Sequence, residues 1–582
     1  MSSLLKSYYS NIQFDYYIFI SHMGYNFKYL LFAFLFFSFI SCESSKNEYH
    51  KKFAVVSAKI EASKAGYEIL KMGGNAFDAM IATDLALSVV YPNAGNLGGG
   101  GFMVYRLSDG DYGSLDFREK APLAATKDMY LDESGNVIKG LSREGALSVG
   151  VPGTVAGLFE VYDRFGSLPL DSLFKPALNL AMNGFPLTNK QAKTFNQNKK
   201  IILSNSNDIE IFNKDFKEGM IFSNPSLHST LQFILENGSE GFYSGKISDE
   251  IINFLSSKGG ILTKDDFLLY KPIWRDPYVF NFADLKIISM GLPSSGGIVL
   301  AQILKSLEIL SLDNFKERDI NYIKTLVELE KLSFADRSKF LGDPDFYDIK
   351  FLDSITSKSY LSSRLKSLNL KKPKPSKDIS PGNISIKESN ETTHYSIVDK
   401  FGNAVSVTTT LNSNFGSKII VPSLGFFMNN EMDDFSIKPG SPNIYGLIGG
   451  DVNSIQPEKR MLSSMTPTII EKNNELSMIL GSPGGPTIIT SVLQTILNVY
   501  LFNDSVKEAV FRPRFHHLWL PDKIYFENNS IDKITKDSMI NSGYIFNRSP
   551  SSIGRVDAIH IDENGKIFAS GDPRGDDYSI GE

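Results

Sequence analysis

The sequence contains almost no cysteine, since Cys42 is the only one among 582 residues. An intrachain disulfide is therefore impossible, and a chain of this length must rely on a buried apolar core. Histidine is scarce as well, with seven dispersed residues and no spacing typical of metal ligands, so we expect no metal site and no cofactor. The net charge of −5 and the scattered lysines and arginines leave no basic patch, which argues against nucleic-acid binding.

Long hydrophobic runs are also missing, with one short exception near the N-terminus. Lys28 precedes an apolar stretch over residues 29–40, which is shorter than the ~20 residues of a membrane span. A positive charge, a short apolar stretch and a small residue before Cys42 together predict an export signal. The end of this segment, Phe39-Ile40-Ser41-Cys42, resembles a bacterial lipobox, which would make Cys42 a lipidation site.

This export signal, residues 1–42, leaves alternatives open. The segment is either a lipoprotein signal, or an uncleaved anchor or plain signal in which the cysteine is incidental. Met23 would give a more ordinary signal than Met1, so the true start could be Met23. In each case we expect an exported protein, either periplasmic or anchored to a membrane by its lipid.

Beyond about residue 50, helical and strand patterns follow one another. Helices are predicted over 61–71, where Gly73 and Gly74 provide the end, and over 76–90, where alanines suit tight packing on a sheet. Helical patterns dominate residues 150–345. A further helix is predicted over 486–501, and strands are predicted over 102–106, 114–118, 406–411, 476–480, 558–561 and 567–570. We therefore expect an α+β layered fold in which helices cover antiparallel sheets.

The composition changes over residues 371–391, which are rich in proline, lysine and serine and poor in large apolar residues. Such a composition is typical of a flexible linker. Alternating β sequence begins directly after it, at Thr392, so this is the clearest boundary in the chain.

The segment after the linker predicts a β-hairpin. Two alternating runs, 392–399 and 404–411, flank a three-residue loop with Gly402 in third position, the form that closes a hairpin with a G1 bulge. Counting outward from this loop places Thr392 opposite Thr410, with their Cβ atoms about 5 Å apart. The register thus brings two hydroxyls together at the first residue after the linker.

A threonine at this place can act as a nucleophile if the chain breaks before it. The new α-amine would have a pKa of about 8 and could take the proton of the Thr392 hydroxyl. Gly484 and Gly485, between a predicted strand and helix, can direct two N–H groups at a developing oxyanion. Taken alone, each feature also has a structural explanation, because threonine is common in strands and Gly-Gly is common in turns.

A series of short motifs runs in order from about residue 50 to the C-terminus. The motifs lie at 98–101, 116–119, 151–154, 391–396, 429–435, 462–465, 482–485 and 513–517. Together they resemble the γ-glutamyltransferase (γ-glutamyltranspeptidase) family. This resemblance implies a four-layer αββα sandwich of the N-terminal-nucleophile hydrolase type.

The resemblance also implies autocleavage between Glu391 and Thr392. The products would be a large chain, residues 43–391, and a small catalytic chain, residues 392–582, which stay together as a heterodimer sharing one core. The implied catalytic residues are Thr392 as nucleophile, Thr410 as support for its amine, and Gly484 and Gly485 as the oxyanion hole.

The same resemblance implies a pocket for the free α-amino acid head of a substrate. Arginine is a bidentate partner for a carboxylate, and acidic side chains favour a bound ammonium. Tyr445 is the expected gate residue of a lid loop over the pocket. The implied ligands are Arg118, Ser463 and Ser464 for the α-carboxylate, and Asn412, Glu431 and Asp434 for the α-ammonium.

The resemblance implies a γ-glutamyltransferase and glutathione hydrolase that transfers the γ-glutamyl group of glutathione or other γ-glutamyl amides to water, amino acids or peptides. A related acylase that cleaves glutaryl-β-lactams is one alternative, although it has little use for an amino-acid clamp. An exported lipoprotein that binds γ-glutamyl peptides without turnover is another, and its chain would stay uncut. No Gly-x-Ser-x-Gly motif supports a Ser-His-Asp hydrolase, and we expect His394 to be a hydrogen-bonded core residue.

Overall fold

The computed structural model describes residues 49–207, 209–347, 352–382, 393–438, 450–548 and 552–582. Residues 50–582 form one unit, and every contact given below lies within it. The predicted export signal, Cys42, Glu391, Thr392 and Tyr445 lie outside the described residues. Within these ranges, no helix combines the length and the apolar surface that crossing a membrane requires.

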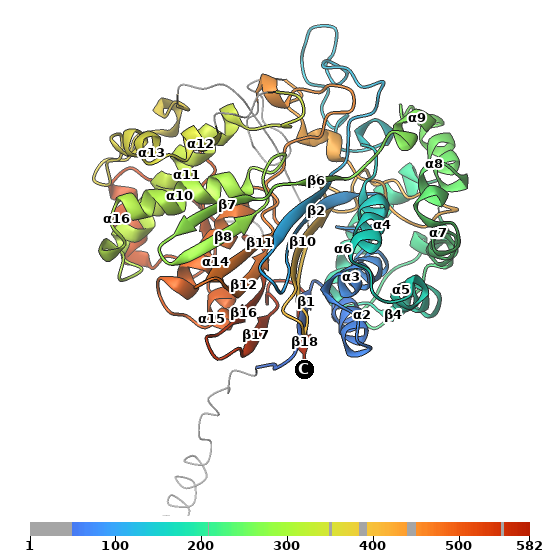
Figure 1. Cartoon of the computed structure of the whole chain (residues 1–582). Helices are drawn as coiled ribbons and strands as arrows, with labels where there is room; N and C mark the ends of the chain where they lie inside the picture. The colour runs from blue at the N-terminus through green and yellow to red at the C-terminus, as the bar shows by residue number, and fades with distance from the viewer. Residues whose placement is uncertain (1–48, 208, 348–351, 383–392, 439–449, 549–551) are drawn as a thin grey trace, which may run out of the picture. The chain divides into compact units, whose positions relative to one another are not determined.

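Two antiparallel sheets form the centre of this unit (Figure 1). The seven-stranded sheet has the order β18 (Tyr578–Gly581), β1 (Ala54–Ser57), β9 (Thr393–Val398), β10 (Ala404–Thr410), β2 (Gly100–Arg106), β3 (Tyr112–Phe117) and β6 (Ile273–Arg275). The six-stranded sheet has the order β17 (Ile567–Ser570), β16 (Asp557–Ile561), β12 (Glu475–Gly481), β11 (Thr468–Lys472), β8 (Leu285–Ser289) and β7 (Tyr278–Phe282).

Successive side chains along a strand point alternately into an apolar layer between the two sheets and into an apolar layer on the outer face of that sheet. In β2, Phe102 and Val104 belong to the core between the sheets, whereas Met103 and Tyr105 belong to the core on the outer face. Ile479 of β12 meets the same inner layer from the other sheet. Because successive side chains of a strand point to opposite faces, both faces of each sheet are buried.

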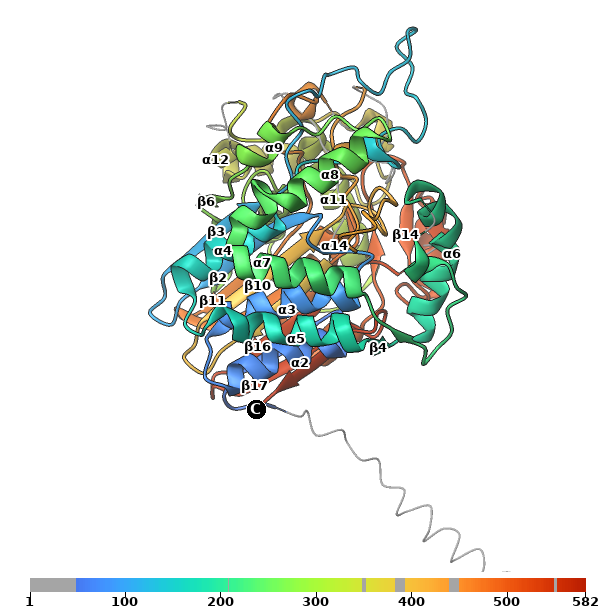
Figure 2. The ribbon, with the colours of Figure 1, turned by 90° about the vertical axis from the view of Figure 1, so that its right-hand side faces the viewer.

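Helices cover the two outer faces, as the two perpendicular views show (Figures 1 and 2). Helices that share the core of the seven-stranded sheet are α2 (Ile60–Lys71), α3 (Ala76–Val90), α4 (Thr154–Phe165), α5 (Leu170–Asn183), α6 (Asn189–Asn205), α7 (Pro225–Tyr243), α8 (Lys246–Ser256) and α9 (Lys264–Leu268). Helices that share the core of the six-stranded sheet are α10 (Gly296–Ile309), α11 (Ile320–Phe340), α14 (Thr487–Tyr500), α15 (Val506–Phe511) and α16 (Lys533–Asn541).

The remaining elements are short. They are α12 (Leu352–Ile355), α13 (Lys358–Leu365), the small sheet of β13 (Phe515–His516), β14 (Ile524–Phe526) and β15 (Phe546–Arg548), and the pair β4 (Phe185–Pro186) and β5 (Ile221–Phe222).

The predicted four-layer αββα architecture is therefore confirmed. The two helices predicted first in the chain are α2 and α3; Asn75 caps α3 through a capping box with Asp78, and all fifteen residues of α3 are buried. The strands β6, β7 and β8 were not predicted. In β8, Ile287 faces the outer helices and its neighbour Ile288 faces the other sheet, so both positions are apolar and the alternation that marks a strand is lost.

The predicted flexible linker, residues 371–391, is held in place over its first part. The N–H and hydroxyl of Ser376 donate to the Asp522 carboxylate at 2.8 and 2.7 Å. The N–H of Gly382 donates to Asp336 at 2.9 Å. Ser376 and Gly382 are thus hydrogen-bonded to the fold, and residues 383–391 lie outside the described part of the chain. The flexible linker over residues 371–391 stays a prediction.

Candidate active site

The hairpin formed by β9 and β10 has the predicted register. Thr393 pairs with Thr409 and Val398 pairs with Ala404, and Gly402 in the connecting loop has φ +93°. This confirms the prediction over the described residues, which end one position short of Thr392. Thr410, the last residue of β10, is fully buried, and its Oγ accepts the N–H of Asn412 at 2.7 Å.

The loop that contains Gly484 and Gly485 follows β12, a strand of the other sheet that packs against this hairpin. Gly481 is the last residue of β12 and faces β9. A Cβ added to Gly481 would lie 2.4 Å from the ring of His394. Gly484 and Gly485 have φ +128° and +59°, and the Gly484 carbonyl accepts both the N–H and the Oγ1 of Thr487 at 3.2 and 2.6 Å. Among the described residues, neither glycine N–H has an acceptor. The assignment of these two N–H groups to an oxyanion hole stays a prediction.

A buried arginine and two carboxylates form the next part of the site. Arg118 follows β3 directly, and its guanidinium donates through Nη1 to Glu431 and through Nη2 to Asp434, all three side chains being fully buried. Glu431 and Asp434 are the first and last residues of a single 3₁₀ turn. Residues three apart in such a turn lie on one face, which explains why both reach Arg118.

This cluster contains more carboxyl groups than arginines, and several of its buried oxygen atoms lack a donor. Glu119 lies beside Arg118, 3.8 Å from its Nη1, and burial raises the pKa of Glu119 to about 8. Within the described chain, both oxygens of Glu119, Oε2 of Glu431 and Oδ1 of Asn412 are buried without a hydrogen-bond donor. Buried acceptors normally have a partner. Their shared chemistry fits a cationic ligand group with several N–H donors, such as an ammonium.

The predicted serine pair lies next to the arginine. Nε of Arg118 donates to the carbonyl of Met461 at 3.3 Å, which ties Arg118 to the segment that carries Ser463 and Ser464. The Oγ of Ser464 accepts from Nη2 of Arg337 at 2.6 Å. The structure therefore joins Arg118, Glu431 and Asp434 directly in one buried cluster. Ser463 and Ser464 follow the Met461 carbonyl that Arg118 contacts, and Nδ2 of Asn412 donates to the carbonyl of Asn430, which precedes Glu431, at 3.0 Å.

Arg337 is a residue that the sequence analysis missed. It lies near the end of α11, where eighteen of twenty-one residues are buried, including six charged ones. Such a helix has no polar face to distinguish a solvated arginine from a buried one. No signal in the single sequence could have identified it.

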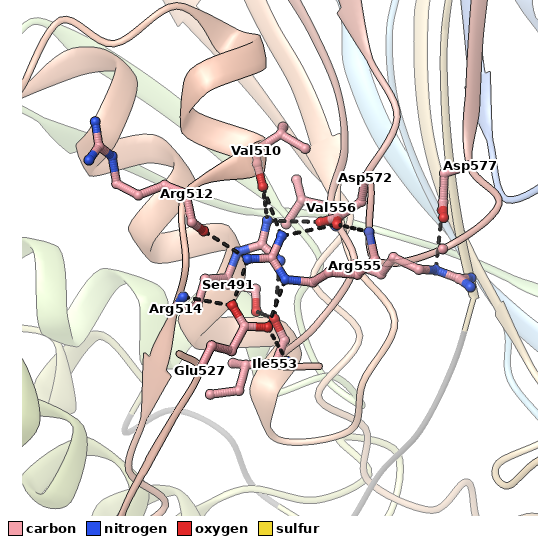
Figure 3. Close-up of polar contacts among 12 residues, drawn as sticks. Ser491, Val510, Arg512, Arg514, Glu527, Ile553, Arg555, Val556, Asp572 and Asp577 are labelled. Atoms are coloured by element: carbon pink, nitrogen blue, oxygen red, sulfur yellow. Dashed lines mark hydrogen bonds and ion pairs between the residues drawn. The ribbon is translucent and has the colours of Figure 1, made fainter. Parts of the chain in front are cut away.

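A second ionic cluster, which includes Arg514 and Glu527, surrounds Ile553 (Figure 3). The carbonyl of Ile553 accepts from Nη1 of Arg514 at 3.1 Å and from Oγ of Ser491 in α14 at 3.2 Å. The Ile553 N–H donates to Glu527 at 2.9 Å, and the Arg555 N–H donates to Ser482 Oγ at 2.8 Å. Residues 553–555 are thus fixed at several points against the loop that carries Gly484.

A sequence model described as gamma-glutamyltranspeptidase matches residues 62–581, which include all of these groups. The chain belongs to the gamma-glutamyltranspeptidase family. It is an enzyme of that family. Glutathione hydrolase proenzyme from Escherichia coli (strain K12) is 41% identical over 538 residues, which cover 91% of this chain and 92% of the relative.

Solved structures agree with this family membership. The structure of Helicobacter pylori gamma-glutamyltranspeptidase has a TM-score of 0.55 and 39% identity, and covers 58% of this chain and 97% of that chain. Cephalosporin acylase from Bacillus halodurans has a TM-score of 0.80 and 24% identity, and covers 93% of this chain and 98% of that chain. The second likeness shows the shared N-terminal-nucleophile hydrolase fold.

The histidines of this gamma-glutamyltranspeptidase family member have structural partners. His394 is fully buried between Thr408 Oγ1 and Ser396 Oγ, each 3.0 Å from a ring nitrogen, and burial lowers its pKa to about 3. This confirms the expected core role. Nδ1 of His516 lies 3.0 Å from Thr490 Oγ1. In the described part of the chain, no group of three or more His, Cys, Asp or Glu residues could hold a metal ion.

A buried carboxyl beneath the hairpin predicts a pH effect on stability. Burial raises the pKa of Asp84 from 3.8 to about 7, although a hydrogen bond from the Tyr395 hydroxyl, at 2.8 Å, acts in the opposite direction. Between these pKa values the unfolded chain has lost a proton that the folded enzyme keeps, so this group's contribution to stability falls as pH rises. We expect Asp84→Asn to gain stability relative to wild type across pH 4–7, on the order of 1 kcal/mol per pH unit.

Urea unfolding of both proteins at several pH values between 4 and 8 measures this difference. Above pH 7 the two curves should run parallel, because Asp84 is then ionised in both states. Curves that are parallel over the whole range would contradict the assigned protonation of Asp84.

Proposed function

We propose that this enzyme cleaves its own chain between Glu391 and Thr392 and then transfers γ-glutamyl groups from glutathione or other γ-glutamyl amides to water, amino acids or peptides. The observation that carries the proposal is the fully buried cluster of Arg118, Glu431 and Asp434, with its surplus of acceptors. Its charges match an α-amino acid head, which has one carboxylate and one ammonium. The relatives named glutathione hydrolase proenzyme support the choice of substrate.

The proposed self-cleavage uses the same hydroxyl as the later reaction. Thr392 Oγ attacks the Glu391 carbonyl, the peptide C–N bond breaks, and the nitrogen becomes the α-amine of Thr392. Water then hydrolyses the resulting ester, which releases the carboxylate of Glu391 and restores the hydroxyl. The predicted register, continued by one residue from Thr393 and Thr409, would set the new amine beside Thr410.

Turnover then proceeds through an acyl-enzyme. Thr392 Oγ attacks the γ-carbonyl, its own α-amine takes the hydroxyl proton, and the N–H groups of Gly484 and Gly485 stabilise the oxyanion. The proton passes to the leaving amine as the amide bond breaks. Water or the amine of an acceptor attacks the ester and releases glutamate or a new γ-glutamyl amide.

Binding of the substrate head would exchange one set of buried ion pairs for another. The α-carboxylate takes donors from Arg118, Ser463 and Ser464, and the α-ammonium takes the place of Arg118 on the carboxylates. The head carries no net charge, so the number of buried charges of each sign stays matched. This matters because an unpaired buried charge is strongly destabilising.

Mass spectrometry and a substrate comparison on purified residues 43–582 test this function. We expect a fragment of roughly 21 kDa, in proportion to residues 392–582 of the 64.7 kDa chain, with the N-terminal sequence Thr-Thr-His-Tyr. We also expect γ-glutamyl-p-nitroanilide to react at least ~100-fold faster than glutaryl-p-nitroanilide, which lacks the ammonium and its charged hydrogen bonds.

Each alternative predicts a different outcome of these two measurements. Equal rates on the two anilides, together with self-cleavage before Thr392, would favour an acylase that recognises only the carboxylate of its substrate. A chain that folds but stays whole and releases no nitroaniline would favour a binding protein.

A further inference from the structure

Asn453 joins two segments of the proposed pocket through its side chain. It is fully buried in a short 3₁₀ turn, Asp451–Asn453. Its Nδ2 donates to the carbonyl of Asp434 at 2.8 Å, and its Oδ1 accepts the N–H of Leu462 at 3.0 Å. Asp434 is a predicted ammonium ligand, and Leu462 directly precedes the serine pair, the predicted carboxylate ligands. One amide therefore connects the two halves of the proposed site for the substrate head.

The backbone around Asn453 is held in place as well. The carbonyl of Asn453 accepts the N–H of Ser436 at 2.9 Å. The buried ammonium of Lys459 donates to the carbonyl of Val452, and also to the carbonyl of Ser454 at 3.1 Å. Because the main chain is fixed on both sides of Asn453, its amide has little freedom to follow a movement of either pocket segment. Asn453 is therefore suited to keep the two segments at a constant separation.

Arg118 also links the two halves, but through groups that the substrate would use. Its guanidinium donates to the carboxylates of Glu431 and Asp434 and, through Nε, to the Met461 carbonyl at 3.3 Å. Under the proposed function, the α-ammonium takes the place of Arg118 on these carboxylates. The side-chain bonds of Asn453 engage backbone groups instead, which the proposed binding mode leaves in place. The link through Asn453 therefore persists when the substrate head is bound.

The separation of the two halves matters because the ammonium and the carboxylate of the substrate share one carbon atom. Covalent geometry fixes the distance between these two groups. A site whose halves move apart can still bind either group, but it cannot bind both at once. The second contact of a two-group head is intramolecular, and the affinity that it adds is lost when the geometry forbids simultaneous contact.

We propose that Asn453 is a positioning residue that sets the distance between the ammonium site and the carboxylate site, and thereby makes the pocket select a head that carries both groups. This inference rests on the proposed function, which places the two groups in these sites. An asparagine is suited to the task because one planar amide offers both a donor and an acceptor. An ionised aspartate of the same shape has no donor, and a leucine of similar size has neither.

Steady-state kinetics with three substrates tests this role. γ-Glutamyl-p-nitroanilide carries both groups, glutaryl-p-nitroanilide lacks the ammonium, and 4-aminobutyryl-p-nitroanilide lacks the carboxylate. The variants Asn453→Asp and Asn453→Leu are assayed after self-cleavage at about pH 8.5, where an aspartate is normally ionised. We expect kcat/KM for the γ-glutamyl anilide to fall roughly 10-fold, as for a lost buried hydrogen bond, mainly through a higher KM. For the other two anilides it should change by less than about three-fold, because a single group needs only one half of the site.

The ratios of the γ-glutamyl value of kcat/KM to the other two values separate positioning from a structural role. A general loss of structure lowers all three values by the same factor and keeps both ratios, and that result would overturn the proposal. Variants that fold but stay uncut would assign Asn453 to self-cleavage instead, which also contradicts it. If Asn453→Leu does not fold, Asn453→Asp decides the question, because aspartate keeps the shape of the side chain.

Asn224→Asp and Asn224→Leu are the matched controls. Asn224 is buried at the start of α7, where its Nδ2 donates to the Gly425 carbonyl at 2.7 Å and its Oδ1 accepts the N–H of Leu227 at 3.0 Å. The same kinds of bond are thus lost outside the proposed pocket, so these variants should lower thermal stability and keep both ratios. A wild-type enzyme with no preference for the γ-glutamyl anilide would refute the proposed function, whereas wild-type ratios in both Asn453 variants would refute this inference alone.

Discussion

The Thr392→Ala variant should remain a single uncut chain and should release no nitroaniline from γ-glutamyl-p-nitroanilide. Under the proposed function, Thr392 Oγ is the nucleophile of both the self-cleavage and the transfer reaction. Alanine keeps the strand position and removes only the hydroxyl and one methyl group, so the fold of residues 50–582 should survive. Denaturing electrophoresis and the anilide assay measure the two losses separately.

Thr392→Ser is the matched control for this variant. Serine keeps the hydroxyl and, after cleavage, the α-amine, so we expect it to cleave and to turn over more slowly than wild type. A Thr392→Ala chain that still separates into two pieces beginning at residue 392 would show that another group performs the cleavage. An uncut Thr392→Ala chain with wild-type turnover would refute the nucleophile assignment itself.

The hairpin register was predictable because its determinants are local. A three-residue loop ending in Gly402 and the alternation of two adjacent runs are enough to align β9 with β10, and the structure pairs Thr393 with Thr409 as counted. The four-layer fold and the identity of the pocket residues came from the resemblance to a family. Their gathering around Arg118 depends on segments more than 300 residues apart, such as Arg118 and Glu431.

The features that the sequence did not reveal depend on distant partners. Arg337 looks like any helical arginine until Ser295 and Ser464 are placed beside it. Residues 371–382 have the composition of a free linker, but Asp522 and Asp336 hold Ser376 and Gly382. In both cases the deciding contact joins polar groups whose proximity is set by the packing of the layers, and composition carries no information about it.

Gly484→Ala should lower kcat by ~10²–10³, the usual effect of losing one oxyanion donor, and should leave KM nearly unchanged. A Cβ on Gly484 would lie 2.5 Å from Thr487 Oγ1 and 3.1 Å from the Cα of Gly554. Neither neighbour can move easily. Thr487 is hydrogen-bonded to the Gly484 carbonyl, and Gly554 lies between Ile553 and Arg555, which are both held by hydrogen bonds. The backbone at φ +128° is moreover one that L residues rarely adopt.

The strain must therefore shift the peptide that carries the oxyanion N–H groups, and a shift of that kind weakens the transition state more than the bound substrate. Gly73→Ala separates this effect from backbone strain alone. Gly73 follows α2 with φ +102°, and a Cβ added to it would have no atom of the described residues within 4 Å, so alanine there adds strain without a clash. We expect Gly73→Ala to lose stability on the order of 1 kcal/mol with unchanged kcat. Turnover of Gly484→Ala within three-fold of wild type, at equal thermal stability, would mean that the oxyanion is stabilised by other groups.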